Sequence, residues 1–363
     1  MLVNAAKLTA QSIIIMSTAL REGEASKRQR VAEDSGSDED DPPEIRLDQH
    51  GRIVGAHGSI NYDFQCFQSL FDGSSWSTAA LDALKRDCRI AFTAQEIDED
   101  EDYSEGETFF VSASATPETD IERLVLSVFR KHTENVTYDH AKSGAEWWTL
   151  VVPADGGGVG FHWDKDYALE EYGVNVFPHL ATVTYVDEGA GAASSPTIAF
   201  QKTAPPMYGS SFAGSAGSQA LVSFPENGKH IIFDGRFLHA AVSDLAKGGV
   251  GVSAERITLL INVWLDHMPV DVDPIEDAAG RLSRGIYGSA VPNFSRPREP
   301  AKLLVADCKS KQTHTWPLTV GETSSKITAT TPANIAELRE ESTIRLIFEE
   351  DALPRVTNGQ SSP

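Results

Sequence analysis

The chain has 363 residues, of which 40% are hydrophobic, enough for the core of one large domain or two small ones. Its formal net charge of −22 at pH 7 disfavours nucleic acid as a partner, because affinity for the phosphate backbone requires an excess of Lys and Arg. Cys66, Cys88 and Cys308 show no pairing or metal-ligand spacing, which favours a reducing, intracellular compartment. No apolar run approaches the roughly 20 residues that span a bilayer, so no membrane partner is expected.

We expect residues 1–44 to form a disordered N-terminal tail. Much of the negative charge lies in residues 33–44 and again in residues 96–107, and runs of like charge repel one another and resist folding. The tail also contains Lys-Arg-Gln-Arg at residues 27–30, a basic cluster typical of nuclear targeting signals. The expected localisation is therefore cytoplasmic or nuclear.

Residues 45–140 are expected to form strands and helices that pack on a central core. Residues 45–60 are rich in glycine and indicate turn-rich strands, and residues 81–85 suggest a short helix. Thr119 or Asp120 can cap a second helix, whose apolar residues recur at positions i, i+3, i+4, i+7 and i+8. These apolar residues are Ile121, Leu124, Val125, Val128 and Phe129. Such a stripe predicts an amphipathic helix packed on a sheet.

The central functional signal is a possible set of metal ligands. His162 and Asp164 are two residues apart, so in a strand their side chains face the same side. One imidazole and one carboxylate suit Fe(II), and a second histidine would complete a two-histidine, one-carboxylate set that leaves positions open for oxygen and a chelating substrate. His239, which follows the apolar stretch of residues 231–233, is the preferred second histidine.

Two other histidines and a second acid are alternatives. His179 and His230 each precede an apolar strand and could replace His239, although histidines at strand ends are typical of solvent-facing turns. Asp166 lies on the same strand face as the preferred carboxylate, but with Lys165 it is interpreted as a charge at the rim of the site.

A possible anion site follows on the next strand. In residues 256–264, alternate side chains share one face of a strand, and Arg256 and Thr258 are neighbours on it. The remaining members of that face are Leu260, Asn262 and Trp264. A guanidinium and a hydroxyl that point inward side by side require an anion.

The order His162-x-Asp164, His239, Arg256-x-Thr258 resembles the 2-oxoglutarate and Fe(II)-dependent oxygenases. Further stretches similar to core strands of that family are residues 143–148, 180–186 and 196–200. The motif is stretched between His162 and His239 and again between His239 and Arg256, where we expect an inserted loop. The resemblance implies a mainly β fold with flanking helices and a double-stranded β-helix (jelly-roll) core.

We assign this core to residues 141–270. A C-terminal extension is expected over residues 271–353, with a late strand at residues 344–348, and a frayed tail over residues 354–363.

The resemblance also implies the role of each site residue. His162, Asp164 and His239 would bind Fe(II), Arg256 would pair with the distal carboxylate of 2-oxoglutarate, and Thr258 would donate a hydrogen bond to it. A bidentate guanidinium–carboxylate pair is a strong and oriented contact. The expected cosubstrates are 2-oxoglutarate and O2, with ascorbate as an accessory reductant and succinate and carbon dioxide as co-products.

The primary substrate is not identified by the sequence. Hydroxylation and oxidative demethylation both fit, and a protein side chain is preferred over a small molecule because the tail has nuclear-like and acidic features. The alternative function is a catalytically inactive β-barrel that binds or scaffolds through its acidic tail. The complete set of three ligands and Arg256 favours the enzyme.

A long segment, residues 202–218, is too rich in Gly, Ser and Ala to build a core. One interpretation is a surface insertion without a function. The other is a mobile lid over the substrate, with Met207, Tyr208 and Phe212 as its apolar contacts.

Overall fold

The computed structural model describes the chain in segments. They are residues 13–14, 45–48, 51–55, 58–72, 75–94, 108–153, 158–188, 195–207, 210–246, 255–270, 272, 274–276, 280–320 and 323–358. The basic cluster at residues 27–30, both acidic runs and nearly all of the predicted tail 1–44 lie outside the described residues, so the predictions for them stay predictions.

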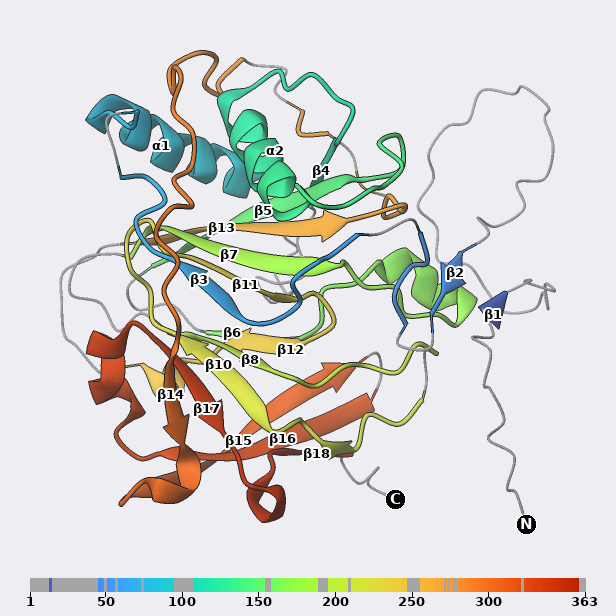
Figure 1. Ribbon diagram of the computed structural model, residues 1–363, viewed down its shortest axis with the longest axis vertical. Helices are drawn as coiled ribbons and strands as arrows, with labels where there is room; N and C mark the ends of the chain where they lie inside the picture. Colours follow the sequence, from blue (N-terminus) through green and yellow to red (C-terminus); the bar gives the residue numbers. More distant parts are fainter. Residues whose placement is uncertain are drawn as a thin grey trace, which may run out of the picture.

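The larger part of the protein is built from two β-sheets (Figure 1). In the described residues the smaller sheet has six strands, and every neighbouring pair is antiparallel. In spatial order these strands are β3 (Gln65–Phe67), β11 (His230–Asp234), β7 (Leu180–Asp187), β13 (Arg256–Trp264), β5 (Gly144–Val152) and β4 (Phe109–Ser112).

The larger sheet has ten strands in the described residues, and its order mixes early and late parts of the chain. In spatial order they are β14 (Ala301–Leu304), β17 (Thr343–Ile347), β10 (Gln219–Ser223), β8 (Thr197–Phe200), β12 (Leu238–Ala241), β6 (Val159–His162), β15 (Lys311–Val320), β16 (Thr323–Pro332), β18 (Arg355–Asn358) and β9 (Gly214–Ser215). Two further short strands, β1 (Ile13–Ile14) and β2 (Arg46–Leu47), pair with each other.

The central eight strands form a double-stranded β-helix. From β5 to β8 the chain alternates between the two sheets, β10 stays beside β8, and from β10 to β13 the alternation resumes. Two facing four-stranded sheets with this winding are a jelly roll. The prediction of a mainly β protein with a double-stranded β-helix core is therefore confirmed.

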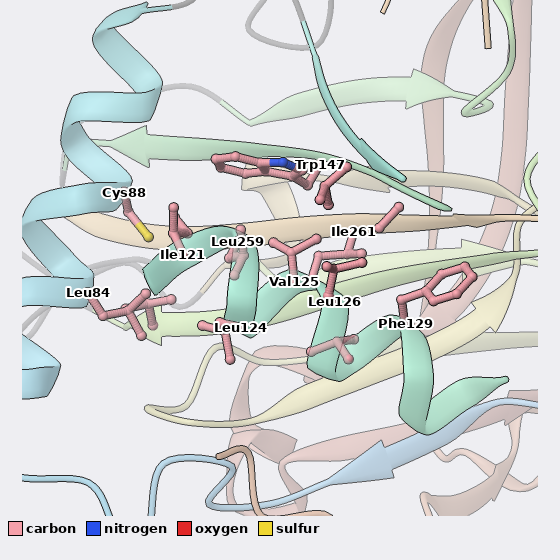
Figure 2. Packing of buried hydrophobic residues seen from close by; sticks show 14 of the residues in the cluster. Leu84, Cys88, Ile121, Leu124, Val125, Leu126, Phe129, Trp147, Leu259 and Ile261 are labelled. Carbon is pink, nitrogen blue, oxygen red and sulfur yellow. The ribbon is translucent and has the colours of Figure 1, made fainter. Parts of the chain in front are cut away.

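Two helices cover the outer face of the six-stranded sheet (Figure 1). They are α1 (Thr78–Ala94) and α2 (Asp120–His132). Their apolar side chains pack against the outward side chains Trp147, Leu259 and Ile261 of the sheet, as Figure 2 shows. Because the inner face is covered as well, every residue of β13 is buried.

The helix predicted from the apolar stripe is α2. Thr119 is its N-cap: the Thr119 hydroxyl accepts a hydrogen bond from the Glu122 backbone N–H at 3.3 Å, and the Glu122 carboxylate accepts one from the Thr119 backbone N–H at 2.9 Å. The first helix, α1, is much longer than the predicted residues 81–85. Its buried face is built largely from alanine and cysteine, which give a weak hydrophobic signal.

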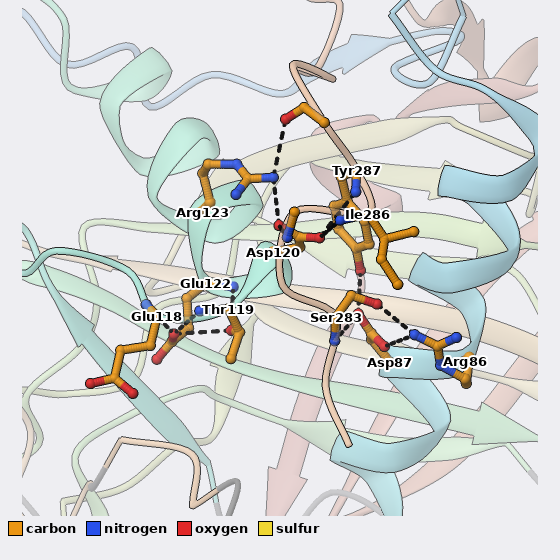
Figure 3. Close-up of polar contacts among 12 residues, drawn as sticks. Arg86, Asp87, Glu118, Thr119, Asp120, Glu122, Arg123, Ser283, Ile286 and Tyr287 are labelled. Atoms are coloured by element: carbon orange, nitrogen blue, oxygen red, sulfur yellow. Dashed lines mark hydrogen bonds and ion pairs between the residues drawn. The ribbon is translucent and has the colours of Figure 1, made fainter. Parts of the chain in front are cut away.

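The C-terminal part of the chain is tied to the helices and to the larger sheet. The Asp120 carboxylate at the start of α2 accepts hydrogen bonds from the backbone N–H groups of Gly285, Ile286 and Tyr287, at 2.7 to 3.0 Å (Figure 3). The Tyr287 hydroxyl in turn donates to Asp87 on α1 at 2.9 Å. These bonds hold the segment that follows the β-helix against both helices.

The predicted late strand is confirmed as β17, which pairs with β10 of the core. The predicted tail at residues 354–363 begins too early, because Arg355–Asn358 form β18 and pair with β16. Val356 of this strand is buried beside Ile327 in the core of the larger sheet. A four-residue strand with one apolar anchor is too short to be recognised from its pattern.

Candidate metal centre

The candidate ligands meet where β6 and β12 pair. His162 is the last residue of β6 and lies directly opposite His239 in the antiparallel register, with the two ring centroids 4.3 Å apart. The carboxylate of Asp164, two residues beyond β6, lies between them: its Oδ1 is 3.5 Å from Nε2 of His162 and 3.4 Å from Nε2 of His239. The three donor atoms all lie within 4.8 Å of one another.

The outer nitrogens of both imidazoles are held by the backbone. Nδ1 of His162 is 2.9 Å from the Gly160 carbonyl oxygen, and Nδ1 of His239 is 3.0 Å from the Phe237 carbonyl oxygen. A carbonyl only accepts, so each Nδ1 carries the proton and each Nε2 keeps its lone pair in the neutral ring. This tautomer and orientation are those of metal-binding histidines, which donate their second N–H to an oxygen.

The electrostatics of the group suit a cation. Burial disfavours the charge on Asp164, but the adjacent His239 and His162 outweigh burial and hold the pKa of Asp164 well below its usual range. Burial lowers the pKa of His239, but the Asp164 charge, the contact with its carboxylate and the hydrogen bond to the Phe237 carbonyl together raise that pKa above its usual value. Two imidazoles and one carboxylate are the donor set of non-haem Fe(II) sites, and three ligands leave coordination positions open. The residues present therefore fit such an ion.

A cavity runs from this group into the β-helix and encloses about 510 Å³, including its open mouth. His162 and His239 line it on the β6–β12 side, and Arg256 and Thr258 line it from β13. The remaining lining is mostly apolar and comes from both sheets: Trp148, Leu150, Val159, Val183, Tyr185, Thr197, Ala240, Ala241 and Leu260.

Arg256 and Thr258 carry buried polar atoms without partners. Arg256 is 6% exposed, and its Nη1 donates to the Ser195 carbonyl at 2.7 Å, but its Nε has no hydrogen-bond partner among the described residues. The Thr258 hydroxyl also lacks one there. Burial lowers the pKa of the guanidinium, and no described carboxylate forms an ion pair with it. Because a buried cation without a counter-ion is costly, this end of the cavity fits an anion.

The alternative histidines lie elsewhere, and the expectation that they face solvent is wrong. His230 is fully buried on the outer face of the six-stranded sheet, where its Nδ1 is 2.7 Å from the Thr184 hydroxyl and its ring stacks on His132. His179 is 2% exposed. Both flank central strands whose outer and inner faces are covered, which buries the strand ends as well. Neither belongs to the metal-ligand group.

The interpretation of Lys165 and Asp166 as rim charges is also wrong. Asp166 is 2% exposed and accepts hydrogen bonds from Nε2 of His267 at 2.8 Å and from the Val270 backbone N–H at 3.1 Å. Lys165 is buried too, paired with Glu170. The strand ends at His162, so the two-residue alternation that put Asp166 on the ligand face no longer applies.

Sequence reasoning did not identify Glu146, a buried acid on β5. Its carboxylate accepts hydrogen bonds from the Thr108 hydroxyl at 2.7 Å, from Trp264 Nε1 at 2.8 Å and from Asn262 Nδ2 at 3.2 Å. All three donors are neutral, and burial raises the pKa of Glu146 to about 7, with the charge of Asp164 adding to the rise. A single acid in an apolar strand has no spacing pattern that could have revealed it.

The segment considered as a lid, residues 202–218, is packed against the protein where it is described. Phe212 is 5% exposed, with its ring centroid 5.2 Å from that of Trp163, and Gly214–Ser215 form β9. Met207 is 48% exposed, while Tyr208 lies outside the described residues. Phe212 therefore packs in the same apolar cluster as Trp163, and the prediction that the segment closes over a substrate stays a prediction.

No protein-family model matches the sequence, and no curated protein matches it. Among solved structures, the chain is similar to the crystal structure of EctD from S. alaskensis with 2-oxoglutarate and 5-hydroxyectoine, at a TM-score of 0.32 and 12% identity over 64% of this chain and 81% of that one. The apo form of EctD matches at a TM-score of 0.32 and 13% identity, over 63% and 84% of the two chains. A likeness this distant says nothing about activity. The fold and the site rest on the topology and distances of the chain itself.

No helix in the described part of the chain is long and apolar enough to cross a membrane.

Proposed function

We propose that the protein is an Fe(II)- and 2-oxoglutarate-dependent dioxygenase that hydroxylates or oxidatively demethylates a substrate. One observation carries the proposal: a single cavity is lined both by members of a two-histidine, one-carboxylate group and by a buried guanidinium that has no counter-ion among the described residues. Bound Fe(II) with 2-oxoglutarate and O2 would supply the oxidation of a C–H bond, with succinate and carbon dioxide as co-products.

The ligand residues would bind and orient the metal. His162 and His239 offer Nε2 lone pairs that their backbone hydrogen bonds keep pointing at Asp164. The carboxylate contributes the one negative charge of the set. Because the described residues supply three ligands to this group, further coordination positions would stay free for a chelating cosubstrate and oxygen.

Arg256 and Thr258 would hold the distal carboxylate of 2-oxoglutarate. The unpaired Nε of Arg256 and the Thr258 hydroxyl are the buried donors available for it. Trp148, Leu150 and Leu260 line the cavity with apolar surface, which excludes water and strengthens a charge-assisted hydrogen bond formed there.

A protein side chain remains our preferred substrate class. The segments that leave the strands at the metal-ligand end carry several exposed large apolar side chains, which are enriched where proteins bind macromolecules. These residues are Tyr167, Tyr172, Met207, Met268 and Val270, between 40% and 56% exposed. Their position around the site supports a macromolecular substrate.

The proposal is tested by conversion of 2-oxoglutarate into succinate under air with Fe(II) and ascorbate, followed by NMR. Oxygenases of this type turn over 2-oxoglutarate slowly without their substrate, so the wild-type protein should form succinate and Asp164→Ala should not. Formation of no succinate by a wild-type protein that binds Fe(II) and 2-oxoglutarate would favour the binding or scaffold function instead.

A further inference from the structure

Asp166 and His267 form a buried pair beside the metal-ligand group. Asp166 is 2% exposed and His267 is 8% exposed. Nε2 of His267 donates a hydrogen bond to Oδ2 of Asp166 at 2.8 Å. The same Oδ2 accepts the Val270 backbone N–H at 3.1 Å, and the backbone N–H of Asp166 donates to the Val176 carbonyl at 2.9 Å. Asp166 is therefore fixed through both its side chain and its backbone.

The pair connects the two sheets at the mouth of the cavity. Asp166 follows Asp164 on the segment that leaves β6 of the ten-stranded sheet. His267 lies three residues beyond Trp264, the end of β13 in the six-stranded sheet. The turn that carries the carboxylate ligand is thus attached to the opposite sheet by a charge-assisted hydrogen bond.

The strand reached by this connection also carries the anion site. Arg256 is the first residue of β13, and β13 is paired on both sides over its length, by β5 and β7, so its two ends keep a fixed separation. A 2-oxoglutarate molecule that binds the metal and Arg256 at once must span a fixed distance. The position of Asp164 relative to β13 decides whether it can.

We propose that Asp166 and His267 are positioning residues, which hold the Asp164 turn at the distance from β13 that lets one 2-oxoglutarate reach both the metal and Arg256. This inference rests on the proposed function. Neither residue belongs to the metal-ligand group or lines the cavity, so both would act through Asp164 and β13. Outer partners of metal ligands commonly change metal affinity by about 10–100-fold when they are removed.

A second Asp–His pair in the chain provides a matched control. Nδ1 of His314 on β15 is 2.9 Å from Oδ2 of Asp244, which follows β12 at the end away from His239. His314 is 6% exposed and, like His267, its ring lies against a tryptophan. The two pairs share a buried histidine against a tryptophan but differ in the acid, because the Asp244 side chain is 48% exposed. Loss of the Asp244–His314 bond should leave the metal–cosubstrate chelate unchanged.

Two variants of His267 separate the hydrogen bond from the ring. His267→Phe keeps a ring against Trp264 and loses the donor, whereas His267→Gln keeps an N–H donor and loses the ring. Each is titrated anaerobically with Fe(II) and 2-oxoglutarate, following the charge-transfer absorption of the iron–2-oxo acid chelate. We expect His267→Phe to weaken the chelate on the order of 10-fold and shift its absorption, and His267→Gln and His314→Phe to stay within about threefold of wild type.

The outcomes distinguish this inference from the proposed function. Absence of the absorption in the wild-type protein would overturn both. If the wild-type protein shows the absorption, and His267→Phe binds 2-oxoglutarate with the same affinity and absorbs at the same wavelength, only the positioning role would be overturned. Should His267→Phe fail to fold, Asp166→Asn replaces it: the amide keeps the volume but accepts only a weaker, neutral hydrogen bond, and an unchanged chelate in that variant would also overturn the role.

Discussion

At one end of the cavity the charge of Asp164 lies between the imidazoles of His162 and His239, whereas at the other end the guanidinium of Arg256 lies beside no described carboxylate. At the first end, both Nδ1 atoms are held by backbone carbonyls and both Nε2 atoms lie near Oδ1 of Asp164. At the second end Arg256 Nε and the Thr258 hydroxyl have no partners among the described residues.

The difference indicates two kinds of dependence on ligands. In the proposed function, the metal-ligand group is a complete donor set, and removal of one member would abolish metal binding. At the other end lies a buried cation, whose energetic cost a bound anion would relieve. Substitutions at the first end should therefore act through the metal, and substitutions at the second through the cosubstrate.

The largest effect is expected for His239→Ala. The group has no spare ligand, so iron affinity should fall by more than the roughly 10–100-fold caused by loss of an outer partner, and turnover should disappear. Equilibrium dialysis with Fe(II) measures it. His230→Gln is the control, because His230 lies on the outer face of the sheet. Retained affinity in His239→Ala together with its loss in the control would transfer the ligand role to His230.

Arg256→Ala should come next and act on the cosubstrate. Loss of a buried, hydrogen-bonded partner of a charge should cost about 2–4 kcal/mol of 2-oxoglutarate binding, measured by calorimetry with the metal present. Arg345→Ala is a matched control, because Arg345 is also a buried arginine but is paired with Asp63. If Arg256→Ala and wild type bind 2-oxoglutarate with equal affinity, the assignment of the cosubstrate to this end of the cavity would be wrong.

Glu146→Gln should change the pH dependence of stability in the metal-free protein. Burial raises the pKa of Glu146 from 4.5 to about 7, so its neutral form is favoured by folding. Its contribution is complete below pH 4.5 and is lost as pH rises through 7, by up to about 3 kcal/mol at 1.36 kcal/mol per unit. In urea unfolding, the free energy of unfolding of Glu146→Gln relative to that of wild type should be higher at pH 8 than at pH 5. Parallel pH profiles would show that Glu146 ionises normally.

The smallest effect is expected for Thr258→Val, which keeps the shape and removes one neutral donor. We expect a loss of about 1 kcal/mol of 2-oxoglutarate binding, with iron affinity unchanged. Calorimetry on this variant and on Arg256→Ala measures which of the two contacts contributes more to the free energy of 2-oxoglutarate binding. A larger loss for Thr258→Val than for Arg256→Ala would reverse their assigned importance.

The β-helix could be anticipated through the resemblance of the ordered residues His162-x-Asp164, His239 and Arg256-x-Thr258 to the oxygenase family, and the candidate ligands through their donor chemistry. Strand alternation does not account for Asp164, because β6 ends at His162. The burial of the polar residues that flank the candidate ligands could not be anticipated from the sequence. Asp166 is buried because His267, 101 residues away, reaches it from the other sheet. His230 is buried because α2 covers the outer face of its strand with His132. Such contacts depend on how distant segments pack, which one sequence does not reveal.

The extent of the larger sheet was missed for a related reason. β15 and β16 form a long hairpin in which threonine and serine occupy much of the exposed face. Pro317 lies within the first strand, and a proline is not typical of strand sequences. Only a few inward residues, such as Trp316, Leu318 and Ile327, mark it as part of a core. The hairpin extends the β-helix at β6, beside the metal-ligand group, through the pairing of Leu318 with Phe161.

The anaerobic titration of the Fe(II)-loaded protein with 2-oxoglutarate tests most directly whether the two ends of the cavity serve one cosubstrate. The wild-type protein should develop the charge-transfer absorption of the chelate. Arg256→Ala should need more 2-oxoglutarate to reach the same absorption, because its binding free energy is weaker by about 2–4 kcal/mol. His239→Ala should show no absorption. An absorption that forms equally well in wild type and Arg256→Ala, or that persists in His239→Ala, would contradict a shared site.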